Sequence, residues 1–202
     1  MKTKVIKKDE LHIAAEYLKK GEIIALPTET VYGLAVVFDN PDAYQKLVDL
    51  KKRPATQPFT MMCCSVKRLP LFIEIDDRIQ RIIDNFMPGP LTIVAPVKAS
   101  MPYHVTLGTG YIGIRVSDQT FIRDLIRSIG KPLLVPSANV HGEAPAKTTE
   151  EVLRMFEGKI PCVIEGEVVS NIPSTVIKID KEITLIREGS IPFEEILKVV
   201  EE

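Results

Sequence analysis

The stretch from residue 23 to residue 38 constrains the fold of this chain more than any other. It begins with the apolar run Ile-Ile-Ala-Leu, which is typical of a buried strand. Pro27 ends the hydrogen bonding of that strand because proline has no N–H, and the polar residues 28–30 follow it. Gly33 permits a tight turn or a close approach of two backbones, and a second apolar run comes next. We therefore predict a strand, a polar corner and another strand.

The polar corner of this stretch has two interpretations. Polar groups at the end of a buried strand commonly line a binding site. Alternatively, the hydroxyls of Thr28 and Thr30 bond to the local backbone of an ordinary turn. The stretch by itself leaves both interpretations open.

Length and composition favour one globular domain. A chain of 202 residues with 45% hydrophobic and 26% charged residues is ordinary for such a domain, so we expect a single domain over residues 1–202. The net charge of −1 excludes a strongly basic surface overall, but it leaves a local basic patch open. No apolar run reaches the roughly 18 residues of a membrane span, and the charged N-terminus does not resemble a signal peptide. We expect a cytoplasmic protein that does not enter a membrane.

The cysteines and histidines form no metal-binding pattern. There is no Cys-x-x-Cys motif, and the three histidines are scattered along the chain. Cys63 and Cys64 are adjacent and therefore poorly placed to bridge each other, and Cys162 is distant in sequence. We interpret all three as reduced, mostly buried thiols, which agrees with a cytoplasmic location. We predict no metal ligand in the chain.

Hydrophobic spacing and capping residues predict a mixture of helices and strands. Helices are expected at 9–20 with Asp9 as the cap, at 41–51 with Asn40 as the cap and Pro41 at the first position, and from Asp76 or Asp77 to residue 86. Further helices are expected at 118–129 with Asp118 as the cap, at 149–156 and at 192–200. Strands are expected at 23–26, 34–38, 59–64, 91–95, 112–116, 133–135, 162–165, 176–179 and 183–186. Because strands and helices do not alternate strictly, we predict an α/β fold with an open, twisted mixed sheet and helices on its faces.

Several cations lie at the ends of these elements. Residues 51–53, Lys-Lys-Arg, end the second helix, where positive charge interacts favourably with the helix C-terminus. The alternative is that they contact an anion. Arg115 lies in an apolar strand, where a guanidinium group requires an anion or a carboxylate partner unless the strand is half exposed.

Convergence of the strand ends would make a pocket of hydroxyls, amides and cations. Such a pocket suits the binding and activation of a polyanion such as a nucleoside triphosphate. The chain has no Gly-x-x-x-x-Gly-Lys-Ser/Thr, so we do not expect a P-loop protein. It also lacks Gly-x-Ser-x-Gly and Gly-x-Gly-x-x-Gly.

Seven short motifs, in order along nearly the whole chain, resemble the YrdC/YciO-type family. They are Pro27–Gly33, Lys51-x-Arg53-Pro54, Pro88–Thr92, Gly113–Val116, Pro136–Asn139 with Gly142, Ser174–Val176 and Ile186-Arg187-x-Gly189. Members of this family are threonylcarbamoyl-adenylate synthases, which join L-threonine, bicarbonate and ATP and release pyrophosphate. A separate complex then transfers the threonylcarbamoyl group to adenosine 37 of tRNAs that read ANN codons. The resemblance implies a YrdC-like fold with a concave basic cavity, and the additional C-terminal domain of longer relatives is not expected here.

The resemblance also implies roles for individual residues. Threonine contacts are implied for Thr28, Met62, Arg115, the backbone of Val135 and Ser174. ATP contacts are implied for Arg53, Gln57, Ser137, the backbone around Pro145 and Arg187. The catalytic pairs of the family match Lys51 with Arg53 and Ser137 with Asn139. Mg²⁺ is expected with ATP, on its phosphates.

The sequence departs from the family at Met62, where many members carry a histidine that contacts threonine. The stretch 59–63 is more similar to the YciO branch, whereas the Lys-x-Arg and Ser-x-Asn pairs are those of the synthase branch. Two other functions therefore stay open. One is a nucleotide- or RNA-binding protein without catalysis, and the other is a carbamoyl-transfer enzyme.

Overall fold

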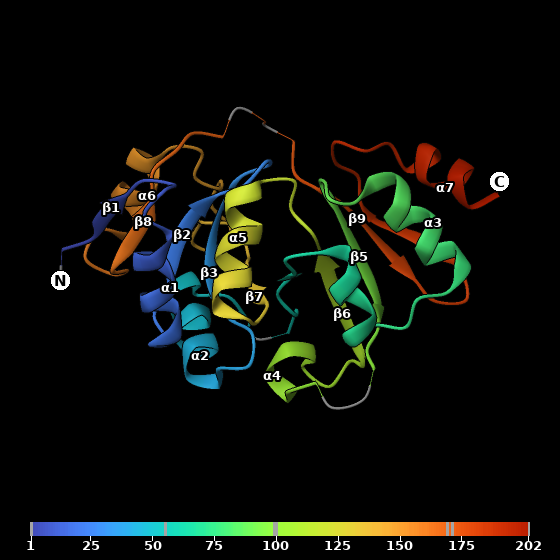
Figure 1. Ribbon diagram of the computed structural model, residues 1–202, viewed down its shortest axis with the longest axis horizontal. Coiled ribbons are helices and arrows are strands. Elements are labelled where there is room, and N and C mark those ends of the chain that lie inside the picture. The colour runs from blue at the N-terminus through green and yellow to red at the C-terminus, as the bar shows by residue number, and fades with distance from the viewer. Residues whose placement is uncertain (1, 55, 99–100, 169, 171, 202) are drawn as a thin grey trace.

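The computed structural model describes residues 2–54, 56–98, 101–168, 170 and 172–201. Ten strands form one twisted sheet in the order β1-β8-β2-β3-β7-β4-β6-β5-β9-β10 (Figure 1). Parallel and antiparallel pairs are mixed, since β2 pairs antiparallel with β3 but parallel with β8. The strands are β1 (Lys4–Ile6), β2 (Ile24–Pro27), β3 (Tyr32–Val37), β4 (Met61–Met62), β5 (Leu91–Pro96), β6 (Tyr111–Arg115), β7 (Leu133–Leu134), β8 (Cys162–Ile164), β9 (Thr175–Ile179) and β10 (Ile183–Arg187).

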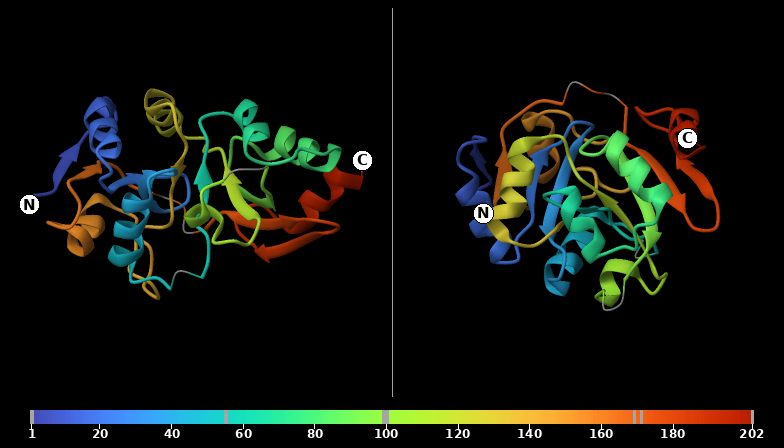
Figure 2. Two further views of the ribbon diagram at one scale, coloured as in Figure 1. Left: turned by 90° about the horizontal axis from the view of Figure 1, so that it is seen from below. Right: turned by 45° about the vertical axis from the view of Figure 1, so that its right-hand side comes forward.

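Helices cover both faces of this sheet. They are α1 (Leu11–Lys19), α2 (Pro41–Lys51), α3 (Asp77–Phe86), α4 (Tyr103–Thr106), α5 (Thr120–Ile129), α6 (Thr149–Phe156) and α7 (Phe193–Glu201). In the left view of Figure 2, the blue α1 and the yellow α5 lie on one side of the sheet, and the cyan α2 and the orange α6 lie on the other. At the far end of the sheet, α3 packs beside α7. The predicted architecture, a twisted mixed α/β sheet with helices on its faces, is confirmed.

Side-chain alternation along the central strands divides the core into two clusters. Leu34 and Val36 of β3 belong to the cluster that includes α2 and α6, whereas Ala35 and Val37 belong to the cluster beneath α1 and α5. Successive side chains of a strand point to opposite faces, so a strand covered on both sides is apolar throughout. All six residues of β3 are buried, as this arrangement requires.

Most predicted elements are present, and the differences have local causes. The predicted strand at 59–64 is shorter in the structure, where only β4 pairs with neighbouring strands. Phe59 and Cys63 are buried but lie outside the strand. An apolar run indicates that a segment is buried, but it does not indicate that the backbone pairs with another strand. The 3₁₀ helix η1 (Val66–Leu71), capped by Ser65, and the elements β1 and α4 were not predicted.

Two predicted helix caps are wrong. Asp9 does not cap α1: its N-cap position is held by Glu10, whose carboxylate accepts a bond from the backbone N–H of Lys7 instead. Asp118 does not cap α5, which begins one position later, after Gln119. No helix in the part of the chain that the structure describes is long and apolar enough to cross a membrane.

Candidate active site

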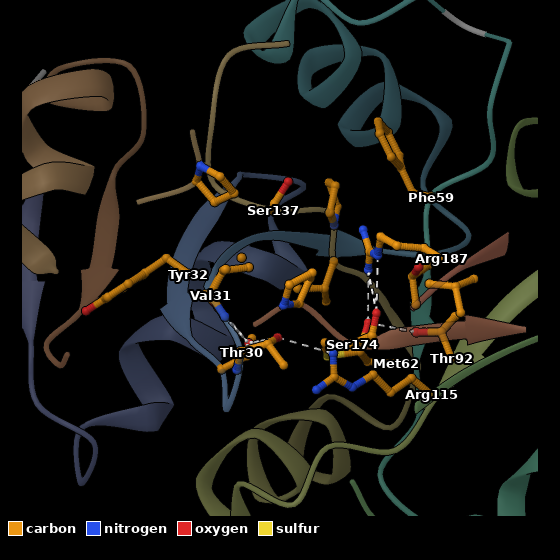
Figure 3. Close-up of a pocket in the computed structure, with 18 of the residues that line it drawn as sticks. Thr30, Val31, Tyr32, Phe59, Met62, Thr92, Arg115, Ser137, Ser174 and Arg187 are labelled. Atoms are coloured by element: carbon orange, nitrogen blue, oxygen red, sulfur yellow. Dashed lines mark hydrogen bonds between the residues drawn. The ribbon is translucent and has the colours of Figure 1, made fainter. Parts of the chain in front are cut away.

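A cavity of about 230 Å³ lies where the ends of strands β3, β7, β4, β6, β5 and β9 converge. The two strands at the middle of this group, β7 and β4, are only two residues long. The wall is formed by hydroxyl, guanidinium and apolar side chains from distant parts of the chain (Figure 3). They belong to residues 28, 30–33, 53, 58–60, 62, 92, 115, 135–137, 145, 173, 174, 176 and 187.

The polar corner between β2 and β3 forms one side of the cavity. The hydroxyl of Thr28 donates to the carbonyl of Val31 at 2.6 Å and accepts from the backbone N–H groups of Thr30 and Val31 at 3.2 Å. Thr28 therefore makes the local bonds of a turn and lines the cavity as well. A Cβ atom on Gly33 would lie 2.5 Å from Val135, so only glycine allows the corner to approach the segment after β7 so closely.

Arg115, the last residue of β6, lies buried against Glu29 of this corner. Its Nη2 is 2.7 Å from the Oε1 of Glu29, a close ionic contact rather than a well-aligned hydrogen bond. Its Nε donates to the carbonyl of Gly89 at 3.2 Å, and its Nη1 lies 3.5 Å from the hydroxyl of Thr30. Arg115 is 4% exposed, so the half-exposed alternative is wrong and the predicted carboxylate partner is present within the protein.

Arg187 reaches the cavity from the end of β10. Its Nη2 donates to the carbonyl of Ser174 at 3.0 Å and to the hydroxyl of the same residue at 3.2 Å. That hydroxyl lies 3.4 Å from the hydroxyl of Thr92 on β5 (Figure 3). Burial and, secondarily, the charge of Arg115 lower the pKa of Arg187 from its usual value. The cation is thus held by neutral oxygens, and no carboxylate in the described part of the chain pairs with it.

Arg53 follows α2 and enters the cavity from a third direction. Its Nη2 donates to the side-chain oxygen of Gln57 at 2.9 Å, and its guanidinium lies 5.1 Å from the ring centre of Phe59. Its Nε is buried and has no hydrogen-bond partner among the described residues. A buried donor without a partner is costly, so this group is suited to an oxygen atom of a ligand.

Lys51, the last residue of α2, does not line the cavity. It is 2% exposed, and its amine donates to the carbonyls of Ser137 and Asn139 and to the side-chain oxygen of Asn139. The hydroxyl of Ser137 donates to the same side-chain oxygen at 2.6 Å. Burial and, secondarily, the charge of Arg53 lower the pKa of Lys51 to about 8. Lys51 and Asn139 therefore hold the corner that carries Ser137 into the wall.

Met62 lies in β4 between two strands. It pairs with Arg115 of β6 on one side and with Leu133 of β7 on the other. The side chain is 3% exposed, packs in the cluster beneath α1 and α5, and lines the cavity. The methionine is therefore both a packing residue and part of the wall.

The structure brings most of the residues implied by the resemblance together. Nine of them line the cavity: Thr28, Arg53, Met62, Arg115, Val135, Ser137, Pro145, Ser174 and Arg187. Gln57, Lys51 and Asn139 lie one contact behind the wall, through Arg53 and Ser137. The hydroxyls of Thr30, Thr60 and Thr92 also line the cavity. The resemblance gave none of the three a role, although Thr30 lies in the predicted polar corner and Thr30 and Thr92 lie within motifs that carried the resemblance.

The wall holds cations and hydroxyls, and it offers little to a protein-bound metal. No group of three or more histidine, cysteine or acidic side chains suited to a metal ion occurs among the described residues. The carboxylate of Glu29, which contacts the wall residue Arg115, is already bonded to Arg115 and Ser117. A divalent cation that entered the cavity would therefore be held by the oxygens of its own ligand.

Comparisons with known proteins identify the family of this chain. The sequence profile of the Sua5/YciO/YrdC family, described as "Telomere recombination", matches residues 16–189. The threonylcarbamoyl-AMP synthase of Pyrococcus abyssi is 34% identical over 196 residues, which are 96% of this chain and 58% of the relative. The putative threonylcarbamoyl-AMP synthase of Methanocaldococcus jannaschii is 34% identical over 98% of this chain and 99% of its own length.

Structural comparison gives the same result. The crystal structure of P. abyssi Sua5 complexed with L-threonine superposes with a TM-score of 0.92 at 32% identity, covering 98% of this chain and 61% of that chain. This chain thus spans less than two thirds of the Pyrococcus proteins that it matches, and nearly all of the Methanocaldococcus relative. On the profile match and the fold together, the chain belongs to the Sua5/YciO/YrdC family, in which it is similar to the threonylcarbamoyl-AMP synthase of P. abyssi and the putative one of M. jannaschii.

Proposed function

We propose that this protein is an L-threonylcarbamoyladenylate synthase that makes threonylcarbamoyl-AMP and pyrophosphate from L-threonine, bicarbonate and ATP. The observation that carries the proposal is the cavity itself, in which Arg53 and Arg187 have no carboxylate partner among the described residues and face a wall of hydroxyls. It also rests on membership of the family and on the threonine complex of P. abyssi Sua5.

The chemistry requires placement of reactants more than covalent help from the protein. The threonine amine and bicarbonate give a carbamate, with loss of water. An oxygen of the carbamate attacks the α-phosphorus of ATP, and the bond between that phosphorus and the bridging oxygen of pyrophosphate breaks. Fixed cations and hydroxyls stabilise the charge that develops on the phosphates, and holding the reactants together lowers the entropic cost.

In this proposal the two ends of the cavity take different parts of the reactants. Arg115, Thr28, Ser174, Met62 and the backbone of Val135 hold the amino acid, where a guanidinium fork suits its carboxylate. Arg53, Arg187 and Ser137 hold ATP, with Gln57 orienting Arg53 and the backbone near Pro145 completing the nucleotide side. Lys51 and Asn139 act through the position of Ser137.

Mg²⁺ enters this proposal as part of the substrate MgATP. Phosphate oxygens are its usual ligands in such sites, and the donor set of the cavity wall fits that arrangement because it offers no cluster of carboxylates. We propose further that the product serves the threonylcarbamoyl modification of adenosine 37 in ANN-decoding tRNAs through a separate transfer complex.

The decisive experiment measures pyrophosphate release and the nucleotide product with each reactant omitted in turn. Release is expected only with ATP, Mg²⁺, bicarbonate and L-threonine together, and mass spectrometry should find threonylcarbamoyl-AMP. Equal release without threonine would count against a synthase. Turnover with carbamoyl phosphate in place of threonine and bicarbonate would favour a carbamoyl-transfer enzyme. A salt-dependent shift of labelled tRNA without any turnover would favour an RNA-binding protein.

A further inference from the structure

Glu29 is an acidic residue that no step of the proposed reaction uses, although it contacts the cavity wall from behind. Its side chain is 8% exposed and that of Arg115 is 5% exposed, so the pair lies almost wholly out of water. Arg115 lines the cavity and Glu29 does not. Arg115 therefore contacts the carboxylate and also forms part of the cavity wall.

The carboxylate of Glu29 has its own bonds satisfied. Oε2 accepts from the hydroxyl of Ser117 at 2.7 Å, and Oε1 accepts from the backbone N–H of Asp118 at 3.2 Å while contacting Arg115. Burial by itself would raise the pKa of Glu29, but the charge of Arg115 and these donors hold it below its usual value. Glu29 is therefore ionised near neutral pH, and three groups fix its position.

The three guanidinium groups of the wall consequently differ in charge balance. Arg53 donates to the neutral amide of Gln57, and Arg187 donates to the neutral oxygens of Ser174. Among the described residues, Arg115 is the member of the three that contacts a carboxylate. One end of the cavity is thus an ion pair, and the other carries two uncompensated cations.

This asymmetry has a consequence for anions of different charge. Coulombic attraction scales with the charge of the ligand, so an arginine without a carboxylate partner favours a polyphosphate over a single carboxylate. Because Glu29 pairs with Arg115, the Arg115 end of the cavity lacks this preference for polyphosphate. The guanidinium keeps donor capacity there, because its Nη1 meets the hydroxyl of Thr30 only at 3.5 Å.

We infer that Glu29 is a positioning and specificity residue that orients and neutralises Arg115, reserving that end of the cavity for the carboxylate of the amino acid and directing phosphates to Arg53 and Arg187. The inference rests on the proposed function for the identity of the amino acid. Its electrostatic part, the exclusion of polyphosphate from the Arg115 end, does not depend on that identity.

The test compares Glu29→Gln with the wild type by calorimetry, using L-threonine and inorganic pyrophosphate as probes. Glutamine keeps the shape of the side chain and removes its charge. In the wild type, saturating pyrophosphate should leave threonine binding almost unchanged. In Glu29→Gln, threonine should bind about tenfold more weakly, and pyrophosphate should bind about tenfold more tightly and compete with threonine.

Three further variants distinguish an effect of the Glu29 charge from an effect on folding. Glu29→Asp keeps the charge and should restore the exclusion of pyrophosphate. Ser117→Ala removes one donor to Glu29 and should weaken threonine a few-fold without any gain for pyrophosphate. Glu22→Gln removes a carboxylate from a surface pair with Lys46 and should change neither affinity.

Two outcomes would contradict the inferred role of Glu29. If Glu29→Gln lowers the melting temperature but leaves both affinities within about twofold, Glu29 only holds the fold and the inference is wrong. The same conclusion follows if Glu29→Asp behaves like Glu29→Gln. If the wild type binds no threonine, the proposed function fails, and the pyrophosphate comparison alone still decides the role of Glu29.

Discussion

The amine of Lys51 lies 2.9 Å from both the main-chain and the side-chain oxygen of Asn139, and it also bonds to the carbonyl of Ser137. Lys51 ends α2, whereas Ser137 and Asn139 follow β7, 86 and 88 residues later in the chain. One buried cation thus fastens a helix to the corner that places a hydroxyl in the cavity wall.

Lys51→Met should lower both stability and turnover. Methionine has a similar length but removes the amine from three oxygens. The carbonyl of Ser137 and the side-chain oxygen of Asn139 each keep a second donor, whereas the carbonyl of Asn139 loses its donor among the described residues, at a cost of about 1–3 kcal/mol if it finds no water. The corner would then no longer hold Ser137 at its position in the cavity wall. Thermal unfolding and pyrophosphate release measure the two effects. Lys46→Met, on the same helix and paired at the surface with Glu22, serves as the control and should be nearly neutral. An unchanged melting temperature in Lys51→Met would contradict the fastening role.

Arg53→Ala should lower turnover while hardly changing the melting temperature. Arg53 packs on Phe59 and reaches Gln57, but its buried Nε lacks a partner, so a ligand gains more from it than the fold does. A fall of about 100-fold or more in pyrophosphate release is expected. Arg53→Lys should be nearly as impaired, since an ammonium group cannot reproduce a two-pronged contact. Near-full activity in both variants would remove Arg53 from the site.

The pH dependence of turnover should report Lys51, whose pKa is about 8. Above that pH the neutral amine has only two N–H groups for three acceptors, so the Ser137 corner loosens and turnover falls. Stability should respond with the opposite sign. The folded pKa lies below the unfolded value of about 10.4, so the unfolded chain binds more protons between these values. The penalty for burying a charged Lys51 is therefore present below pH 8 and lost as the pH rises toward 10.4.

Parallel pH profiles of turnover and of the free energy of unfolding test this assignment. In Lys51→Met, the fall in turnover near pH 8 should disappear, because methionine does not titrate. A fall that persists unchanged in that variant would assign the transition to another group.

Met62→His should tighten threonine binding without changing the affinity for ATP. The wall position of Met62 gives a histidine access to the amino acid, and one gained hydrogen bond is worth about 0.5–1.5 kcal/mol, or several-fold in affinity. Calorimetry with threonine and with ATP measures both. Met61→His is a matched control, because that side chain packs in the opposite cluster and does not line the cavity. It should destabilise the protein without improving threonine binding.

Two results would revise the interpretation of Met62. Weaker binding of both ligands in Met62→His would show that the residue acts chiefly in packing. No threonine binding in either protein, with ATP binding retained, would refute the amino-acid assignment and favour a divergent nucleotide-binding member of the family.

The sequence determined much of the fold because its information is local. The apolar runs, Pro27 and Gly33 predicted β2, the corner and β3, and Asn40 with Pro41 predicted the start of α2. Periodicity and capping depend on neighbours within a few residues, so they can be read along the chain. The motif resemblance also selected nine residues that the structure places in one wall.

Only the tertiary structure decided what these residues contact. Lys51 and Glu29 each find their partners more than 80 residues away, and the hydroxyls of Thr30 and Thr92 join the wall through the positions of β3 and β5 in the sheet. Periodicity shows that Lys51 lies on a helix and Arg115 on a strand, but it contains nothing about which segments pair across the sheet. The strand order β3-β7-β4-β6-β5-β9 brings their ends together, and that order arises from packing among distant segments, which no local pattern in the sequence records.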